Sequence, residues 1–148
     1  MSETNELNVI NTFVQQKQGA VALACVAMAT NTDYDTLLQK YADVPVELNV
    51  AGLRNVLWNI PNTYHLQYID AIMFGSRLYI IQLPSLVEES KLHFVVVDLR
   101  GEQPVVLDPN FGIEGYKAYT QISDIKHYVN VIEVINMESP STEEGDIL

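Results

Sequence analysis

The sequence contains little cysteine, little positive charge and no long hydrophobic run. Cys25 has no second cysteine to pair with, so an internal disulfide is excluded and a reducing compartment is expected. No apolar run approaches the roughly 20 residues that span a bilayer. Residues 1–16 contain neither Lys nor Arg, and they have no apolar core of signal-peptide type. We therefore expect a cytoplasmic protein that does not insert into membranes.

Positive charge is scarce, because 8 Lys and Arg side chains stand against 19 Asp and Glu, for a net charge of −11. Such a chain repels nucleic-acid phosphates and anionic lipid, so direct nucleic-acid binding is not expected. A peptide or protein partner could be basic, although a solvated acidic surface explains the same charge without any partner. Part of the charge lies in the last eleven residues, at Glu138, Glu143, Glu144 and Asp146.

The common metal and cofactor signatures are also missing. No CxxC, HExxH, GxGxxG, GKS or GKT pattern occurs, so we expect neither a metal nor a nucleotide cofactor. What the chain does have is apolar residues, at 48% of its 148 positions. A chain of this size and composition can fold as one domain that removes roughly 68–70% of its unfolded surface from water.

Three helices are predicted in the first half of the chain. Residues 19–30, GAVALACVAMAT, are apolar on all sides, which is typical of a buried helix. A second helix is predicted over 33–43, capped by Thr32 or Asp33. A third is predicted over 50–60, where apolar residues recur with helical spacing and Pro61 follows.

After Pro61 the apolar pattern changes to that of strands. Strands are predicted over 65–72, 77–84, 92–99, 103–109 and 128–135, with a short helical turn over 122–128 before the last. The third and fourth are separated by a short turn containing Gly101, which favours an antiparallel hairpin. Helices followed by strands predict an α+β domain over 1–136. Residues 137–148 are polar and acidic, so a disordered tail is expected there.

Three stretches of the sequence form a set. They are QQKQGAVALACVAM at 15–28, HFVVV at 93–97 and VVLDPNFG at 105–112. Together they resemble the papain-like peptidases that remove double-glycine leader peptides from bacteriocins, over roughly residues 10–135. The resemblance implies a papain-like fold, with N-terminal helices packed on a C-terminal antiparallel sheet.

Members of that family usually read Q-x-x-x-x-D-C-G-x-A-C-x-A-M in the first stretch, and the first cysteine is the nucleophile that opens the central helix. Laid on this pattern, Gln15 matches the glutamine that stabilises the oxyanion. Val21 stands at the nucleophile position, between Ala20 and Ala22, and Cys25 matches the second, non-catalytic cysteine. The resemblance therefore implies a degenerate member that lacks the catalytic thiol.

The other two stretches supply the acid–base residues of the family pattern. His93 matches the general-base histidine at the start of a central strand, and Asp108 matches the acid that orients it. The spacing of fifteen residues from His93 to Asp108 suits two adjacent antiparallel strands that bring both side chains together. The W-x-G pattern often seen before the last strand is absent, and KHYVN stands there at 126–130.

The chemistry of such a site depends on the missing thiol. A thiolate at a helix N-terminus beside an imidazolium attacks the substrate, and the histidine transfers the proton. The isopropyl group of Val21 has no lone pair, and loss of the nucleophile in a comparable serine triad lowers the rate by about 10⁶. We therefore expect no active catalytic residue, and a domain that recognises or inhibits a peptide or protein.

Two other functions remain open from the sequence. Cys25 could be the nucleophile of an active peptidase or amide-transfer enzyme, although a cysteine inside an Ala-rich helix is usually an inert core residue. The chain could instead be an acidic inhibitor that docks on a basic partner, which its net charge alone supports. Taken singly, Gln15 is also typical of a solvated loop, His93 of a structural strand residue, and Asp108 of an ordinary turn before proline.

Overall fold

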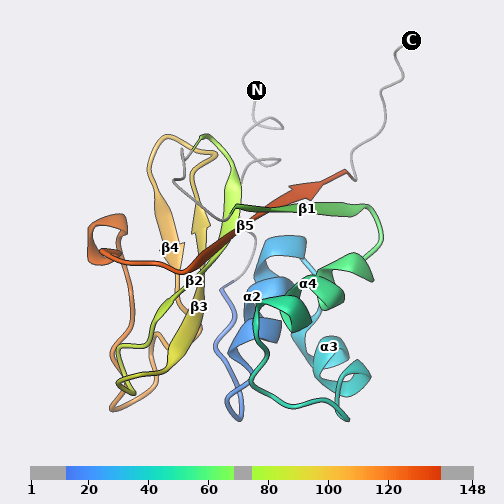
Figure 1. Ribbon diagram of the computed structural model, residues 1–148, viewed down its shortest axis with the longest axis horizontal. Helices are drawn as coiled ribbons and strands as arrows, with labels where there is room; N and C mark the ends of the chain where they lie inside the picture. The colour runs from blue at the N-terminus through green and yellow to red at the C-terminus, as the bar shows by residue number, and fades with distance from the viewer. Residues whose placement is uncertain (1–12, 69–74, 138–148) are drawn as a thin grey trace.

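The computed structural model describes residues 13–68 and 75–137 of the chain. Three helices come first: α2 (Val21–Thr30), α3 (Tyr34–Lys40) and α4 (Val50–Trp58). Five strands follow, with the 3₁₀ turn η1 (Ile122–Asp124) before the last: β1 (Thr63–Tyr68), β2 (Leu78–Pro84), β3 (Leu92–Asp98), β4 (Val105–Leu107) and β5 (Asn130–Asn136). The predicted α+β class is therefore confirmed (Figure 1).

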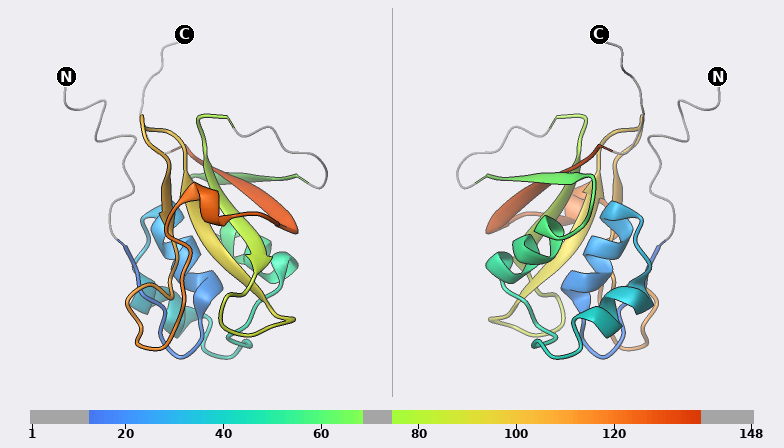
Figure 2. Two further views of the ribbon diagram at one scale, coloured as in Figure 1. Left: turned by 90° about the vertical axis from the view of Figure 1, so that its left-hand side faces the viewer. Right: turned by 90° about the vertical axis from the view of Figure 1, so that its right-hand side faces the viewer.

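The five strands form one antiparallel sheet in the order β1-β5-β2-β3-β4. The predicted hairpin of β3 and β4 is confirmed by the pairing of Val96 with Leu107. The last strand, β5, lies between β1 and β2, so the end of the described chain joins the edge strand β1 to the centre of the sheet. Two views in Figure 2 show α4 lying beside β1.

Helix α2 is the centre of the larger core. All its residues from Ala22 to Thr30 are buried, and they pack against one face of the sheet through side chains such as Ile80, Val96 and Ile132. Its small Ala side chains allow the helix to approach the sheet closely. The helix begins at Val21 rather than at the predicted Gly19, because Gly19 has a φ of +84° that a right-handed helix does not accept.

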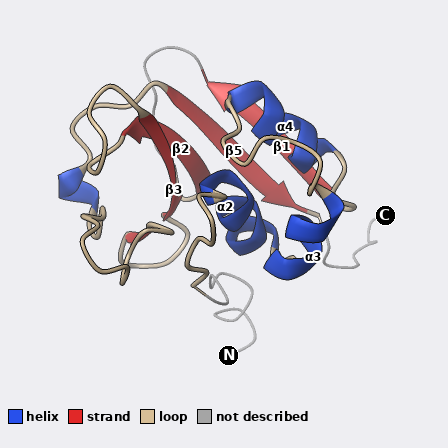
Figure 3. Ribbon diagram, turned by 90° about the horizontal axis from the view of Figure 1, so that it is seen from below, coloured by secondary structure: helices blue, strands red, loops and turns tan. Residues whose placement is uncertain are grey.

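The opposite face of the sheet has a core of its own. Period-two alternation sends Tyr79, Ile81 and Val95 to this face. The connection between β4 and β5 covers them with Tyr119 and Ile125, and Figure 3 shows this connection and η1 on the far side of β2 and β3 from α2. Strands β2 and β3 are thus buried on both faces, which explains their near-continuous apolar sequences.

Some predicted bounds differ from the structure. The first strand begins earlier than predicted, at Thr63, and the second helix ends earlier, at Lys40. The Asp33 cap is confirmed, because its carboxylate accepts a hydrogen bond from the Thr36 N–H at 2.9 Å. Residues 69–72 of the predicted first strand and the predicted acidic tail from 138 onward lie outside the described residues.

Burial on the α2 face makes Ile80 a sensitive test of the core. Ile80 is fully buried, so Ile80→Ala should lower the free energy of unfolding by about 2–5 kcal/mol, through lost apolar burial and a residual cavity. The exposed Ile122 of η1 offers a matched control, and Ile122→Ala should change stability by less than about 0.5 kcal/mol. Chemical denaturation of both variants measures the difference, and equal losses would contradict this packing.

Candidate functional site

A cavity of about 690 Å³ opens where β2 ends and β3 begins. Four segments contribute to its walls: the chain entering α2, the loop before α4, the β2–β3 connection and the loop after β4. Residues from these segments include Gln16, Val21, Val46, Leu48, Val87, Leu92, His93, Asn110 and Tyr116. Both cavity volume and mixed lining are in the range of small-ligand and peptide sites.

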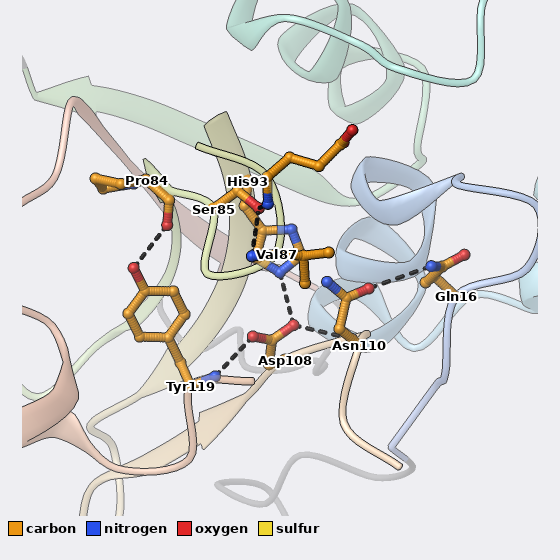
Figure 4. A network of polar contacts seen from close by, with 9 residues as sticks. Gln16, Pro84, Ser85, Val87, His93, Asp108, Asn110 and Tyr119 are labelled. Carbon is orange, nitrogen blue, oxygen red and sulfur yellow. Dashed lines mark hydrogen bonds and ion pairs between the residues drawn. The ribbon is translucent and has the colours of Figure 1, made fainter. Parts of the chain in front are cut away.

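The structure brings His93 and Asp108 together, as their spacing predicted. Nε2 of His93 lies 2.6 Å from Oδ1 of Asp108, and both side chains are buried. Strand β3 carries the histidine, and the aspartate directly follows β4, the neighbouring strand of the hairpin. The pair therefore rests on the antiparallel register of β3 and β4 (Figure 4).

Two backbone groups fix the state of the Asp108 carboxylate. Oδ1 also accepts the N–H of Asn110 at 2.9 Å, and Oδ2 accepts the N–H of Tyr119 at 2.8 Å. A backbone N–H can only donate, so both carboxylate oxygens act as acceptors in these two bonds. In the third bond, between Asp108 and His93, the hydrogen therefore belongs to Nε2 of the ring. The carboxylate thus holds His93 in the tautomer with its proton on Nε2.

The other ring nitrogen of His93, Nδ1, is available to a ligand in the cavity. No residue of the described chain is a hydrogen-bond partner of Nδ1, and the side chain is only 6% exposed while it lines the cavity. In the neutral ring this nitrogen is an acceptor, and in the protonated ring it is a donor. A ligand inside the cavity can therefore exchange a proton or form a hydrogen bond with His93.

The start of α2 places hydrocarbon in the same cavity. Val21 and Ala22 occupy the first turn of the helix, and both line the cavity that His93 lines. Neither side chain has a group that His93 could deprotonate. The structure thus places Val21 at the helix start, where the family resemblance puts the nucleophile, and no nucleophile stands there.

Cys25 lies one turn further along α2 and does not line this cavity. Its side chain is fully buried in the helix core. Burial raises the pKa of the Cys25 thiol well above its usual value, and the negative charge of Asp108 raises that pKa further. At neutral pH the group is therefore a protonated core thiol, which is a poor nucleophile.

The side chains of Gln15 and Gln16 point to different places. Gln15 is exposed and its amide donates to the carbonyl of Phe111 at 3.0 Å, whereas Gln16 lines the cavity. The assignment of the oxyanion position to Gln15 therefore stays a prediction. Of the two glutamines only Gln16 lines the cavity, and its backbone N–H donates to the carbonyl of Pro109 at 2.8 Å. Gln16 and Asn110 were missed by sequence reasoning, since a loop gives no periodic signal for which residue points inward.

Comparison with known proteins adds no family. No protein-family model and no curated protein matches the chain.

Within residues 13–68 and 75–137, no three His, Cys, Asp or Glu side chains gather as metal ligands would. No helix in those ranges is long and apolar enough to cross a membrane. The site must therefore be interpreted from its own geometry.

The Asp108 contacts predict the tautomer of His93. In the neutral ring we expect ¹⁵N NMR to show a protonated Nε2 and an unprotonated Nδ1, because Asp108 accepts the Nε2–H. The exposed His127 is the internal control and should show a mixture of tautomers. A His93 spectrum with the proton on Nδ1 would contradict the assigned geometry.

Burial of Cys25 predicts slow alkylation. Iodoacetamide at neutral pH should label native Cys25 at least roughly a hundredfold more slowly than the chain in concentrated guanidinium chloride, because only the thiolate of an opened molecule reacts. Intact-mass spectrometry gives both rates. Fast native labelling that disappears in a His93→Gln variant would instead identify Cys25 as an activated nucleophile.

Proposed function

We propose that this chain is a catalytically inactive, papain-like peptidase domain that recognises a peptide or protein segment in the cavity beside His93. One observation carries the proposal. His93, held by the buried Asp108, lines the same cavity as the first turn of α2, and the side chains of that turn, Val21 and Ala22, are hydrocarbon only. An acid–base pair without a nucleophile can position a ligand, but it cannot form an acyl-enzyme.

The walls of the cavity favour an extended peptide as ligand. Apolar side chains at its rim are substantially exposed, namely Val46, Val87, Leu92 and Tyr116. Polar groups lie among them, including the amides of Gln82 and Asn110. Apolar walls with a few fixed polar groups suit the alternating side chains and backbone groups of a bound peptide.

Charge at the rim is compatible with a basic partner. Lys91 lies 3.9 Å from Glu47 and 4.0 Å from Glu88, so one lysine is shared by two carboxylates. All three side chains are exposed, and pairs of this kind contribute little by themselves. They nevertheless leave the rim with a net negative charge, which matches the acidity of the whole chain.

The alternative of an active enzyme that uses Cys25 finds no support in the site. The thiol is fully buried, and it is outside the cavity lined by His93. Inhibition of a basic partner remains compatible with the proposal, because an inactive peptidase domain can inhibit by binding. The site thus supports recognition in preference to cleavage.

A matched pair of leucine variants tests recognition in the cavity. Leu92 at the rim and Leu66 on β1 are both 51% exposed. A degenerate library of N-acetylated hexapeptides is passed over immobilised protein, and bound peptides are quantified by mass spectrometry. Leu92→Ser should weaken retention roughly tenfold through lost apolar contact, whereas Leu66→Ser should leave it unchanged.

Two results would reject the proposal. The first is that no peptide of the library is retained by the native protein above a blank surface. The second is that Leu92→Ser and Leu66→Ser behave alike, which would place any binding elsewhere on the molecule.

A further inference from the structure

Three nearly buried side chains that line the cavity, His93, Asn110 and Gln82, have a nitrogen atom without a hydrogen-bond partner in the described residues. His93 is 6% exposed and Asn110 is 5% exposed, and both line the cavity. Nδ1 of His93 and Nδ2 of Asn110 have no hydrogen-bond partner in the described parts of the chain. Neither nitrogen is fully closed off from solvent, so both are available for a hydrogen bond to a ligand in the cavity.

The hydrogen-bond network fixes which way the Asn110 amide points. Oε1 of Gln16 accepts the N–H of Gly19 at 2.8 Å, so the other atom of the Gln16 amide is the nitrogen. That nitrogen donates to Asn110 at 3.2 Å, and the atom that accepts must be Oδ1. The NH₂ group of Asn110 is therefore the free end, and Figure 4 draws it on the side of His93.

The start of α2 adds backbone donors to the same wall. Its N-cap residue, Ala20, has no side chain that could accept from the helix, and its first turn contains no acidic residue. The N–H of Val21 bonds to the carbonyl of Gly19, but the N–H groups of Ala22 and Leu23 have no acceptor in the described chain. An uncapped helix N-terminus has roughly half a positive charge.

All these groups favour a negatively charged acceptor. The Asn110 amide and the helix N–H groups can only donate, and His93 becomes a donor when it is protonated beside the Asp108 carboxylate. Charge-assisted hydrogen bonds to a carboxylate are roughly twice as strong as those to a neutral carbonyl. Glu47 and Glu88 oppose an anion, but they are exposed at the rim and screened by solvent and by Lys91.

We infer that the cavity takes the free C-terminal end of a peptide. This inference rests on the proposed function, in which the cavity binds a peptide. The terminal carboxylate bonds to Asn110, His93 and the first turn of α2. The preceding residues contact apolar side chains such as Val87 and Leu92. An internal segment would offer these donors only neutral carbonyls. The net charge of −11 selects against ligands with further negative charge, so neutral or basic residues precede the carboxylate.

The test compares two forms of one peptide library. N-acetylated degenerate hexapeptides are prepared once with a free C-terminal carboxylate and once as C-terminal amides, and both are passed over the immobilised protein. We expect the acid form to be retained roughly ten- to hundredfold more strongly, as expected for hydrogen bonds to a charged group. Acetate is added in a separate run to measure how far a small carboxylate competes.

A pair of substitutions at Val21 locates the carboxylate. Val21→Asp places a fixed carboxylate in the first turn of α2, which satisfies the helix N–H groups and repels the ligand. This variant should stay folded, because Val21 is only partly buried, and it should lose the preference for the acid library. Val21→Thr introduces no charge and should retain the preference. Circular dichroism verifies that both variants are folded.

The outcomes separate this inference from the proposed function. Equal retention of both libraries overturns the carboxylate site but leaves peptide recognition intact. Retention of amide peptides only when they contain Asp or Glu assigns the site to a side-chain carboxylate and overturns the C-terminal assignment. Retention of neither library overturns both. An acid preference that survives Val21→Asp also overturns the inference, because the helix start would then have no part in it.

Discussion

The buried carboxylate of Asp108 is the contact on which the site depends. It accepts hydrogen bonds from β3 through His93, from the loop after β4 through Asn110, and from the long connection through Tyr119. These three segments come from different parts of the sequence. A buried carboxylate is stable only when its lone pairs are satisfied. The same bonds that satisfy Asp108 therefore fix the orientation of His93 and the position of the cavity wall.

A buried ionic pair often adds nothing to the stability of the fold, because replacing it with well-packed apolar residues of similar volume often gives an equally stable protein. In this molecule Asp108 is buried, and its partner His93 lines a cavity. The neighbouring turn of α2 has no nucleophile, and the only thiol of the chain is buried one turn away. Polar groups therefore point toward a cavity in which the first turn of α2 has no side chain able to attack a bound substrate. Such an arrangement is suited to holding a ligand.

Much of this arrangement could be predicted from local sequence. The helical and strand periodicities located α2, α4, β2 and β3, and the hairpin spacing placed His93 beside Asp108. The insertion of β5 between β1 and β2 could not be predicted, because strand order depends on contacts distant in sequence. Nor could the place of Gln16 in the cavity wall, where its backbone bonds to Pro109, a residue distant in sequence.

The most direct test introduces a thiol at Val21, the position that the resemblance assigns to a nucleophile. In Val21→Cys, alkylation by iodoacetamide is followed against pH by peptide mapping, so that Cys25 is observed separately. The account predicts that the new thiol reacts as a thiolate well below the usual cysteine pKa of about 8.5, and that His93→Gln abolishes this shift. An ordinary titration near about 8.5 that is indifferent to His93→Gln would contradict the account.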